Sequence, residues 1–183
     1  MCSSDLAFDP HDLLRARRLA AQARDATDVQ AAMELYRQAV QADPADWYQL
    51  VEAARVALDA GGAAELALAM SAQALQRNPW FSPELWCVHG DALRSLDRPA
   101  EARAAYQRGL AASPRHVRLL WSLARVATET GRFEDAFRLL GEALACDRTG
   151  DGRGDCLQLL DVALRRHALA LEVERGLSAA RPA

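Results

Sequence analysis

The strongest constraint on the fold of this chain is an internal period of 35 residues. Pro44, Pro79 and Pro114 each close an alanine-rich amphipathic segment, and they follow one another at intervals of 35 (44 to 79 and 79 to 114). Proline cannot continue a helix and biases the residue before it toward extended backbone. A fourth segment, FEDAFRLLGEALACDR, has the same pattern but ends in Arg148. A fixed period of this length is typical of repeat proteins, whose units stack to bury their apolar faces.

Within each unit, small and large side chains alternate along one predicted helix face. A small residue is followed four positions later by a larger one, and three positions after that by a second small one. In that order the residues are Ala32, Tyr36 and Ala39; Ala67, Ser71 and Ala74; Ala102, Tyr106 and Gly109; and Ala136, Leu140 and Ala143. These spacings are helical. We expect the small residues to let two helices of a hairpin approach each other closely.

A second helical stripe precedes the first one in every unit. It begins 16 residues before the first alanine, at Ala16, Val51, Trp86 and Leu120. Short breaks separate the two stripes, at Thr27-Asp28, Gly61-Gly62, Asp97-Arg98-Pro99 and Gly131-Arg132. Each unit is therefore predicted to be a helix, a turn and a second helix.

One unit carries a recognisable motif. The run Trp86-x2-His89-Gly90-x2-Leu93, followed by Ala102-x3-Tyr106 and Pro114, resembles the tetratricopeptide repeat (TPR) pattern W-x2-L-G-x2-Y, A-x3-F and P. The resemblance covers residues 13–150. It implies an all-α fold, a right-handed α-solenoid of about four TPR helix-turn-helix repeats with a C-terminal capping helix.

The repeat boundaries follow from this register. We predict an N-terminal tail, the four repeats, a flexible glycine-containing linker, and a capping helix with a tail that covers the last apolar face. The ranges are 1–12, then 13–47, 48–82, 83–116 and 117–148, then 149–155 and 156–183. Residues 2–6 resemble the translated end of a sequencing adapter, and one hypothesis is that they are an assembly artefact and that the chain is a fragment.

Composition argues against several classes of function. The net charge is −3, from 22 basic and 25 acidic residues, which does not supply the positive field that nucleic-acid binding needs. No apolar run is long enough to cross a membrane, and no export signal is seen, so a cytoplasmic location with free thiols is expected. The cysteines and histidines lack metal-site spacing, and Asp147, Asp151 and Asp155 stand four apart, unlike the ligands of a calcium loop. We therefore expect no catalytic residues, no metal and no cofactor.

The TPR resemblance also implies a binding surface, because the first helices of such units line a concave groove. The expected groove residues are Arg17, Gln49, Glu52, Glu84, Cys87, Asp91, Arg94, Arg118, Trp121 and Arg125. The expected partner is another protein, bound through a peptide segment or a helix. We predict that the basic part of this partner faces Glu52, Glu84 and Asp91.

Arg118, Trp121 and Arg125 stand at i, i+3 and i+7 and share one predicted helix face. One hypothesis is that the tryptophan and the two guanidiniums grip a peptide carboxylate. The alternative is that Trp121 packs against the C-terminal cap while the arginines are solvated.

Two further hypotheses concern the whole chain. Bacterial TPR arrays are often fused to glycosyltransferase or methyltransferase domains, so the chain could be the non-catalytic arm of a larger, truncated enzyme. Solenoids with an uncovered end can also stack end to end, which makes self-association a third hypothesis.

Overall fold

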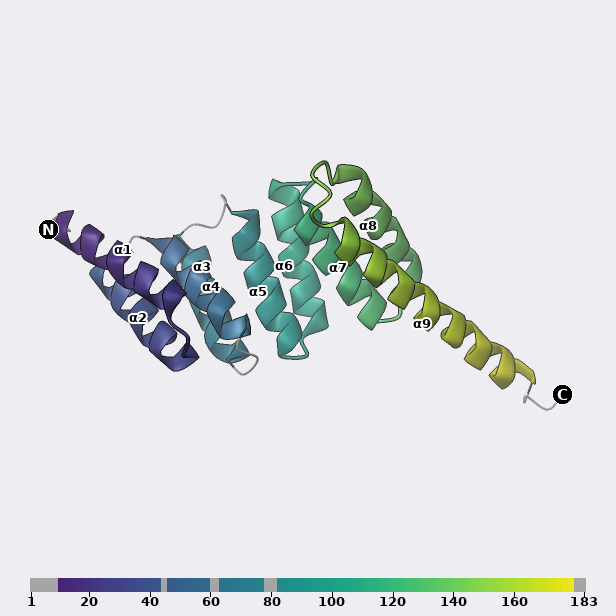
Figure 1. Cartoon of the computed structure of the whole chain (residues 1–183). Coiled ribbons are helices and arrows are strands. Elements are labelled where there is room, and N and C mark those ends of the chain that lie inside the picture. The colour runs from purple at the N-terminus through teal and green to yellow at the C-terminus, as the bar shows by residue number, and fades with distance from the viewer. Residues whose placement is uncertain (1–9, 44–45, 60–62, 78–81, 180–183) are drawn as a thin grey trace, which may run out of the picture. The chain divides into compact units, whose positions relative to one another are not determined.

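The computed structural model describes residues 10–43, 46–59, 63–77 and 82–179. These residues form nine α-helices and no strand (Figure 1). The chain divides into two units, Met1–Trp80 and Phe81–Ala183. The all-α repeat architecture predicted from the sequence is confirmed.

The first unit contains two helical hairpins. Its helices are α1 (Pro10–Asp25), α2 (Val29–Ala42), α3 (Trp47–Asp59) and α4 (Ala64–Arg77). The helices of each hairpin pack together, and α2 also packs on α3. Asp28 caps α2, since its carboxylate accepts a hydrogen bond of 2.8 Å from the Ala31 backbone N–H. Helix α1 begins at Pro10, inside the segment 1–12 that the sequence assigned to a tail.

The second unit contains two more hairpins and one long helix. Its helices are α5 (Pro83–Ser95), α6 (Pro99–Ala112), α7 (Val117–Glu129), α8 (Phe133–Cys146) and α9 (Arg153–Ala179). Helix α7 packs against its own partner α8 and also against α6, α5 and α9. It is therefore the helix around which this unit is organised.

The two hairpin turns of the second unit are built alike. The backbone N–H of Arg98 donates to the Leu93 carbonyl at 3.0 Å, and that of Arg132 donates to the Ala127 carbonyl at 2.8 Å. The residue before each of these N–H groups has a positive φ, 55° at Asp97 and 74° at Gly131. This left-handed residue is the usual way to end a helix and reverse the chain. The turns lie where the sequence placed the breaks.

The repeated small and large residues form the core of both units. All twelve residues of the small–large–small pattern are buried in the structure. The close approach that the small residues permit is most evident at Gly90. A Cβ atom built there would lie 2.3 Å from Cε1 of Tyr106, the large residue of the facing helix α6. Gly90 belongs to the second stripe, but Gly109 of the small–large–small pattern is also closely packed, since a Cβ built there would lie 2.8 Å from Cβ of Trp86 on the facing helix α5.

Helix α9 covers α8 and also contacts α7. Cys156 and Ala163 are fully buried on its packing side. The helix has 27 residues whereas α8 has 14, so it extends well past α8 (Figure 1). It begins at Arg153, so Arg153, Gly154 and Asp155, which the sequence assigned to the linker, lie in its first turn. An aspartate there is favourable, because the N-terminal end of a helix attracts negative charge.

Candidate functional site

The groove residues predicted in the first unit differ in accessibility. Arg17 is exposed on α1, whereas Gln49 and Glu52 of α3 are buried. The Glu52 carboxylate accepts a hydrogen bond of 2.6 Å from Arg55, which satisfies its charge inside this unit. Gln49 donates to Asp46 at 3.1 Å. Only Arg17 of these three presents its side chain openly to solvent.

In the second unit, Asp91 of α5 is the centre of a polar cluster. Its Oδ1 atom accepts a hydrogen bond from the Tyr106 hydroxyl and another from the Arg125 guanidinium, both at 2.7 Å. Its Oδ2 atom accepts a longer one, 3.4 Å, from Arg118. The carboxylate thus joins α5, α6 and α7. Charge-assisted bonds of this kind are among the stronger polar contacts in proteins.

The other α5 residues predicted for the groove either contact other side chains of the protein or are buried. Glu84 accepts a hydrogen bond from Ser82 (3.1 Å) and lies 3.2 Å from Nε2 of His116, and Arg94 pairs with Glu129 at 3.3 Å. Cys87 is fully buried, and this burial raises the pKa of its thiol to about 12. Cys87 is therefore a core residue with an unreactive thiol, since the thiolate is the nucleophilic form.

Trp121 of α7 is partly exposed and stands between these charges and the start of α9. The guanidinium of Arg125 lies 4.5 Å from the centre of its ring, within the range of a cation–π contact. The hypothesis of a solvated Arg125 is wrong, because this residue pairs with Asp91 and its side chain is only 21% exposed.

Trp121 also forms one wall of a pocket of about 470 Å³. We call it the α7–α9 pocket, and its defining residues are Arg118, Trp121, Asp147, Asp151, Asp155 and Cys156. They come from α7, the loop after α8 and the first turn of α9. The pocket lies entirely within the second unit.

The three aspartates of this pocket were not among the predicted groove residues. Their spacing of four was the available signal, but on its own it indicated only that a calcium loop is absent. What brings them together is the loop after α8, where Gly150 takes a φ of 82° and Oδ1 of Asp147 accepts a 2.8 Å hydrogen bond from its N–H. Among the described residues, no three His, Cys, Asp or Glu side chains are arranged to hold a metal ion.

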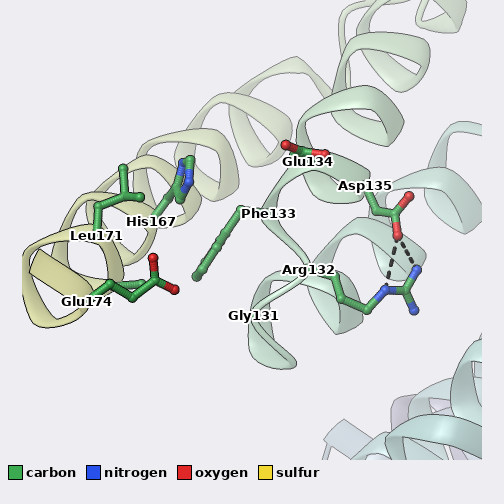
Figure 2. A pocket seen from close by; sticks show the side chains of 9 residues that line it. Gly131, Arg132, Phe133, Glu134, Asp135, His167, Leu171 and Glu174 are labelled. Atoms are coloured by element: carbon green, nitrogen blue, oxygen red, sulfur yellow. Dashed lines mark hydrogen bonds and ion pairs between the residues drawn. The ribbon is translucent and has the colours of Figure 1, made fainter. Parts of the chain in front are cut away.

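A second pocket, of about 580 Å³, lies between the start of α8 and the second half of α9 (Figure 2). The ring of Phe133 stacks on the imidazole of His167, with 5.2 Å between their centres. Arg132 pairs with Asp135 on the other side of the α8 start. The stacking of Phe133 on His167 attaches α9 to the start of α8.

Before and after this attachment, α9 exposes apolar side chains. Six of them are between 40% and 61% exposed: Leu157, Val162, Leu164, Leu169, Leu171 and Val173. The helix nevertheless lacks the length of continuous apolar sequence that a bilayer crossing would require, and the same holds for every other helix in the described residues.

The chain contains successive helical hairpins that repeat at a fixed sequence interval and share a small–large–small core pattern. These features define an α-helical repeat protein. Residues 87–151 match the family model described as tetratricopeptide repeat, in agreement with the resemblance seen in the sequence. No curated protein matches the sequence significantly.

Solved structures with the same fold extend over most of the chain. A crystal structure of MamA protein has a TM-score of 0.68 at 19% identity, covering 96% of this chain and 98% of its own. TTC0263, a thermophilic TPR protein in Thermus thermophilus, has a TM-score of 0.65 at 24% identity, covering 88% and 89%. YrrB, described as a TPR protein with an unusual peptide-binding site, has a TM-score of 0.58 at 18% identity, covering 90% of each chain. At these identities the similarity establishes the fold.

Proposed function

We propose that the chain is a protein-interaction scaffold that binds a peptide segment or a helix of another protein on the face where Arg118 and Trp121 of α7 are accessible. The single observation that carries this proposal is the α7–α9 pocket, with a partly exposed tryptophan in its wall. Tryptophan beside arginine is a combination enriched at the energetic centres of protein interfaces. The proposal assigns no catalytic step to the chain.

The internal contacts make this surface rigid before any partner arrives. Arg125 holds one side of the Trp121 ring and is itself held by Asp91, which Tyr106 also contacts. A pre-ordered side chain loses less entropy on binding, so more of the contact energy appears as affinity. The peptide-binding site named for YrrB supports a peptide as the kind of partner, because that protein shares the fold.

Affinity capture from a lysate of the source cells tests the proposal. Wild-type chain is compared with Trp121→Ala, and with Gln107→Ala as a control that shortens an exposed side chain on α6. All three must first show equal helical content by far-UV circular dichroism. We expect a partner that wild type and Gln107→Ala retain and Trp121→Ala loses.

Two other results count against the proposal. A partner that all three proteins retain equally places the binding surface elsewhere on the chain. A lysate from which none of the three retains any protein contradicts the role of a scaffold for proteins of that cell.

A further inference from the structure

The electrostatic balance of the α7–α9 pocket is negative. Three aspartates, Asp147, Asp151 and Asp155, line it together with a single cation, Arg118. Arg118 already lies 3.4 Å from the Asp91 carboxylate, which partly neutralises the positive charge of the arginine. A carboxylate entering this pocket would meet three like charges at short range, whereas a cation would be attracted.

The thiol of Cys156 lies in the same surroundings. Burial, together with the negative charges of Asp147 and Asp155, raises the pKa of the Cys156 thiol, as expected where the thiolate would face other anions. The two aspartates thus disfavour a negative charge on this thiol, as they would on an anion that entered the pocket.

Two buried polar atoms of the lining residues have no hydrogen-bond partner among the described residues. One is the Oδ2 atom of Asp147, an acceptor, and the other is Nε1 of Trp121, a donor. Buried polar atoms are normally satisfied, and an unpaired carboxylate oxygen is among the costlier exceptions. The unpaired Oδ2 atom therefore leaves a negative charge beside the pocket that no donor among the described residues offsets.

The shape of the pocket agrees with a long side chain. Val117 and the Trp121 ring supply apolar walls, and the loop comes close to α7, since a Cβ added to Gly152 would lie 3.2 Å from Cγ1 of Val117. The methylene groups of arginine and lysine pack on apolar surface while the charged end reaches polar groups. The aromatic wall is therefore placed to contact the methylene groups of such a side chain, and the acidic groups are placed to contact its charged end.

We propose that the α7–α9 pocket binds a cationic side chain, arginine or lysine, of the protein segment that docks beside Trp121. This inference rests on the proposed function and adds the chemistry of the partner. It moves the basic part of the partner away from Asp91, whose Oδ1 atom accepts from Tyr106 and Arg125 and whose Oδ2 atom accepts from Arg118. It also replaces the hypothesis that Trp121 and its two neighbouring arginines grip a carboxylate.

The test is a titration that needs no knowledge of the partner. The probes are the N-acetyl amides of arginine, lysine, citrulline and glutamate, where citrulline is the neutral isostere of arginine. The readout is the Trp121 indole N–H resonance in a 1H–15N correlation spectrum, assigned by its absence in Trp121→Phe. We expect saturable shifts with the arginine and lysine probes, and no saturable shift with the citrulline or glutamate probes at equal ionic strength.

Matched variants show whether the aspartates cause this selectivity. Asp151→Asn/Asp155→Asn should weaken binding of the arginine probe by about tenfold, because two attractive charges are lost. Asp161→Asn removes one carboxylate charge on the exposed side of α9, more than one turn beyond the pocket, and should leave binding unchanged. The inference is overturned if the glutamate probe binds in place of the arginine probe, if neither cationic probe shifts the resonance, or if the double variant binds as tightly as wild type.

The outcomes separate this inference from the proposed function. A partner whose capture depends on Trp121, combined with cationic probes that do not bind, refutes the pocket assignment and leaves the scaffold in place. Cationic probes that bind to a chain with no Trp121-dependent partner refute the scaffold and leave the pocket in place.

Discussion

Replacing Gly90 by alanine tests the close packing of the α5–α6 hairpin. The added Cβ would lie 2.3 Å from Cε1 and 2.7 Å from Cδ1 of Tyr106, where ordinary contacts begin at 3.4 Å. The ring must therefore withdraw by about 1 Å, or the hairpin must open by that amount. Either movement strains the 2.7 Å hydrogen bond from the Tyr106 hydroxyl to Asp91.

The expected change in stability combines three contributions. Overpacking a close-packed core costs about 1–3 kcal/mol. Losing a hydrogen bond to a charged acceptor costs about 1.5–3 kcal/mol. Alanine is a better helix former than glycine by about 1 kcal/mol, which acts in the opposite direction. The net expectation is a destabilisation of about 2–4 kcal/mol, since the strain and the lost bond partly describe the same movement.

The chain offers a matched control at Gly141, in the interior of α8. Apart from its chain neighbours and the backbone of its own helix, no atom lies within 4 Å of a Cβ built at this position. Gly141→Ala should therefore show the helix-propensity gain alone and stabilise the protein by up to about 1 kcal/mol. The same substitution is thus expected to have opposite signs at the two sites.

Urea unfolding followed by far-UV circular dichroism measures both effects. Repeat arrays can unfold in steps, so midpoints are compared only where the dependence on denaturant concentration is unchanged. A Gly90→Ala variant with a midpoint at or above that of wild type would refute the packing argument. Equal losses at Gly90 and Gly141 would show that the effect is not steric.

Three further predictions concern the core and its ionisable groups. With the pKa of Cys87 raised to about 12 by burial, a thiol reagent at mildly alkaline pH should modify half-buried Cys146 long before Cys87, and equal rates in the native protein would contradict this. Burial, with Arg108 and Arg98 nearby, lowers the pKa of His89, so the unfolded chain binds the proton more readily. Stability should therefore fall as the pH drops from the usual histidine value of 6.5 toward the lowered one, and His89→Gln should flatten this slope in urea melts at several pH values. Leu140 is fully buried and Leu169 is 61% exposed, so Leu140→Ala should cost about 2–5 kcal/mol and Leu169→Ala less than about 0.5 kcal/mol, a difference that thermal unfolding would resolve.

The fold was predictable because its determinants are local and repeated. The position of Tyr106 four residues after Ala102 already placed both on one face of a helix. The same reasoning placed the turns at Asp97 and Gly131, where the backbone takes a positive φ. The start of α9 was less predictable, because glycine in 149–155 suggested a loop while Asp155 is favourable in the first turn of a helix.

The candidate site was predictable only in part. Helical spacing correctly brought Arg118, Trp121 and Arg125 to one region of α7, but it could not show that Arg125 is paired with Asp91. Those two residues are 34 positions apart in the chain, and their contact depends on how α5 packs against α7.

The sequence by itself thus determined that this chain is a series of helical hairpins with small residues at the close contacts, since periodicity is a property of neighbours along the chain. Only the tertiary structure decided which charges are satisfied and which face a pocket. It paired Asp91 with Tyr106 and Arg125, and it brought Asp147 and Asp155 into the pocket that Trp121 lines. The physical reason is that the strength of an ion pair depends on the distance and the solvent between its two groups. For residues that lie far apart in the sequence, the packing of the helices sets both.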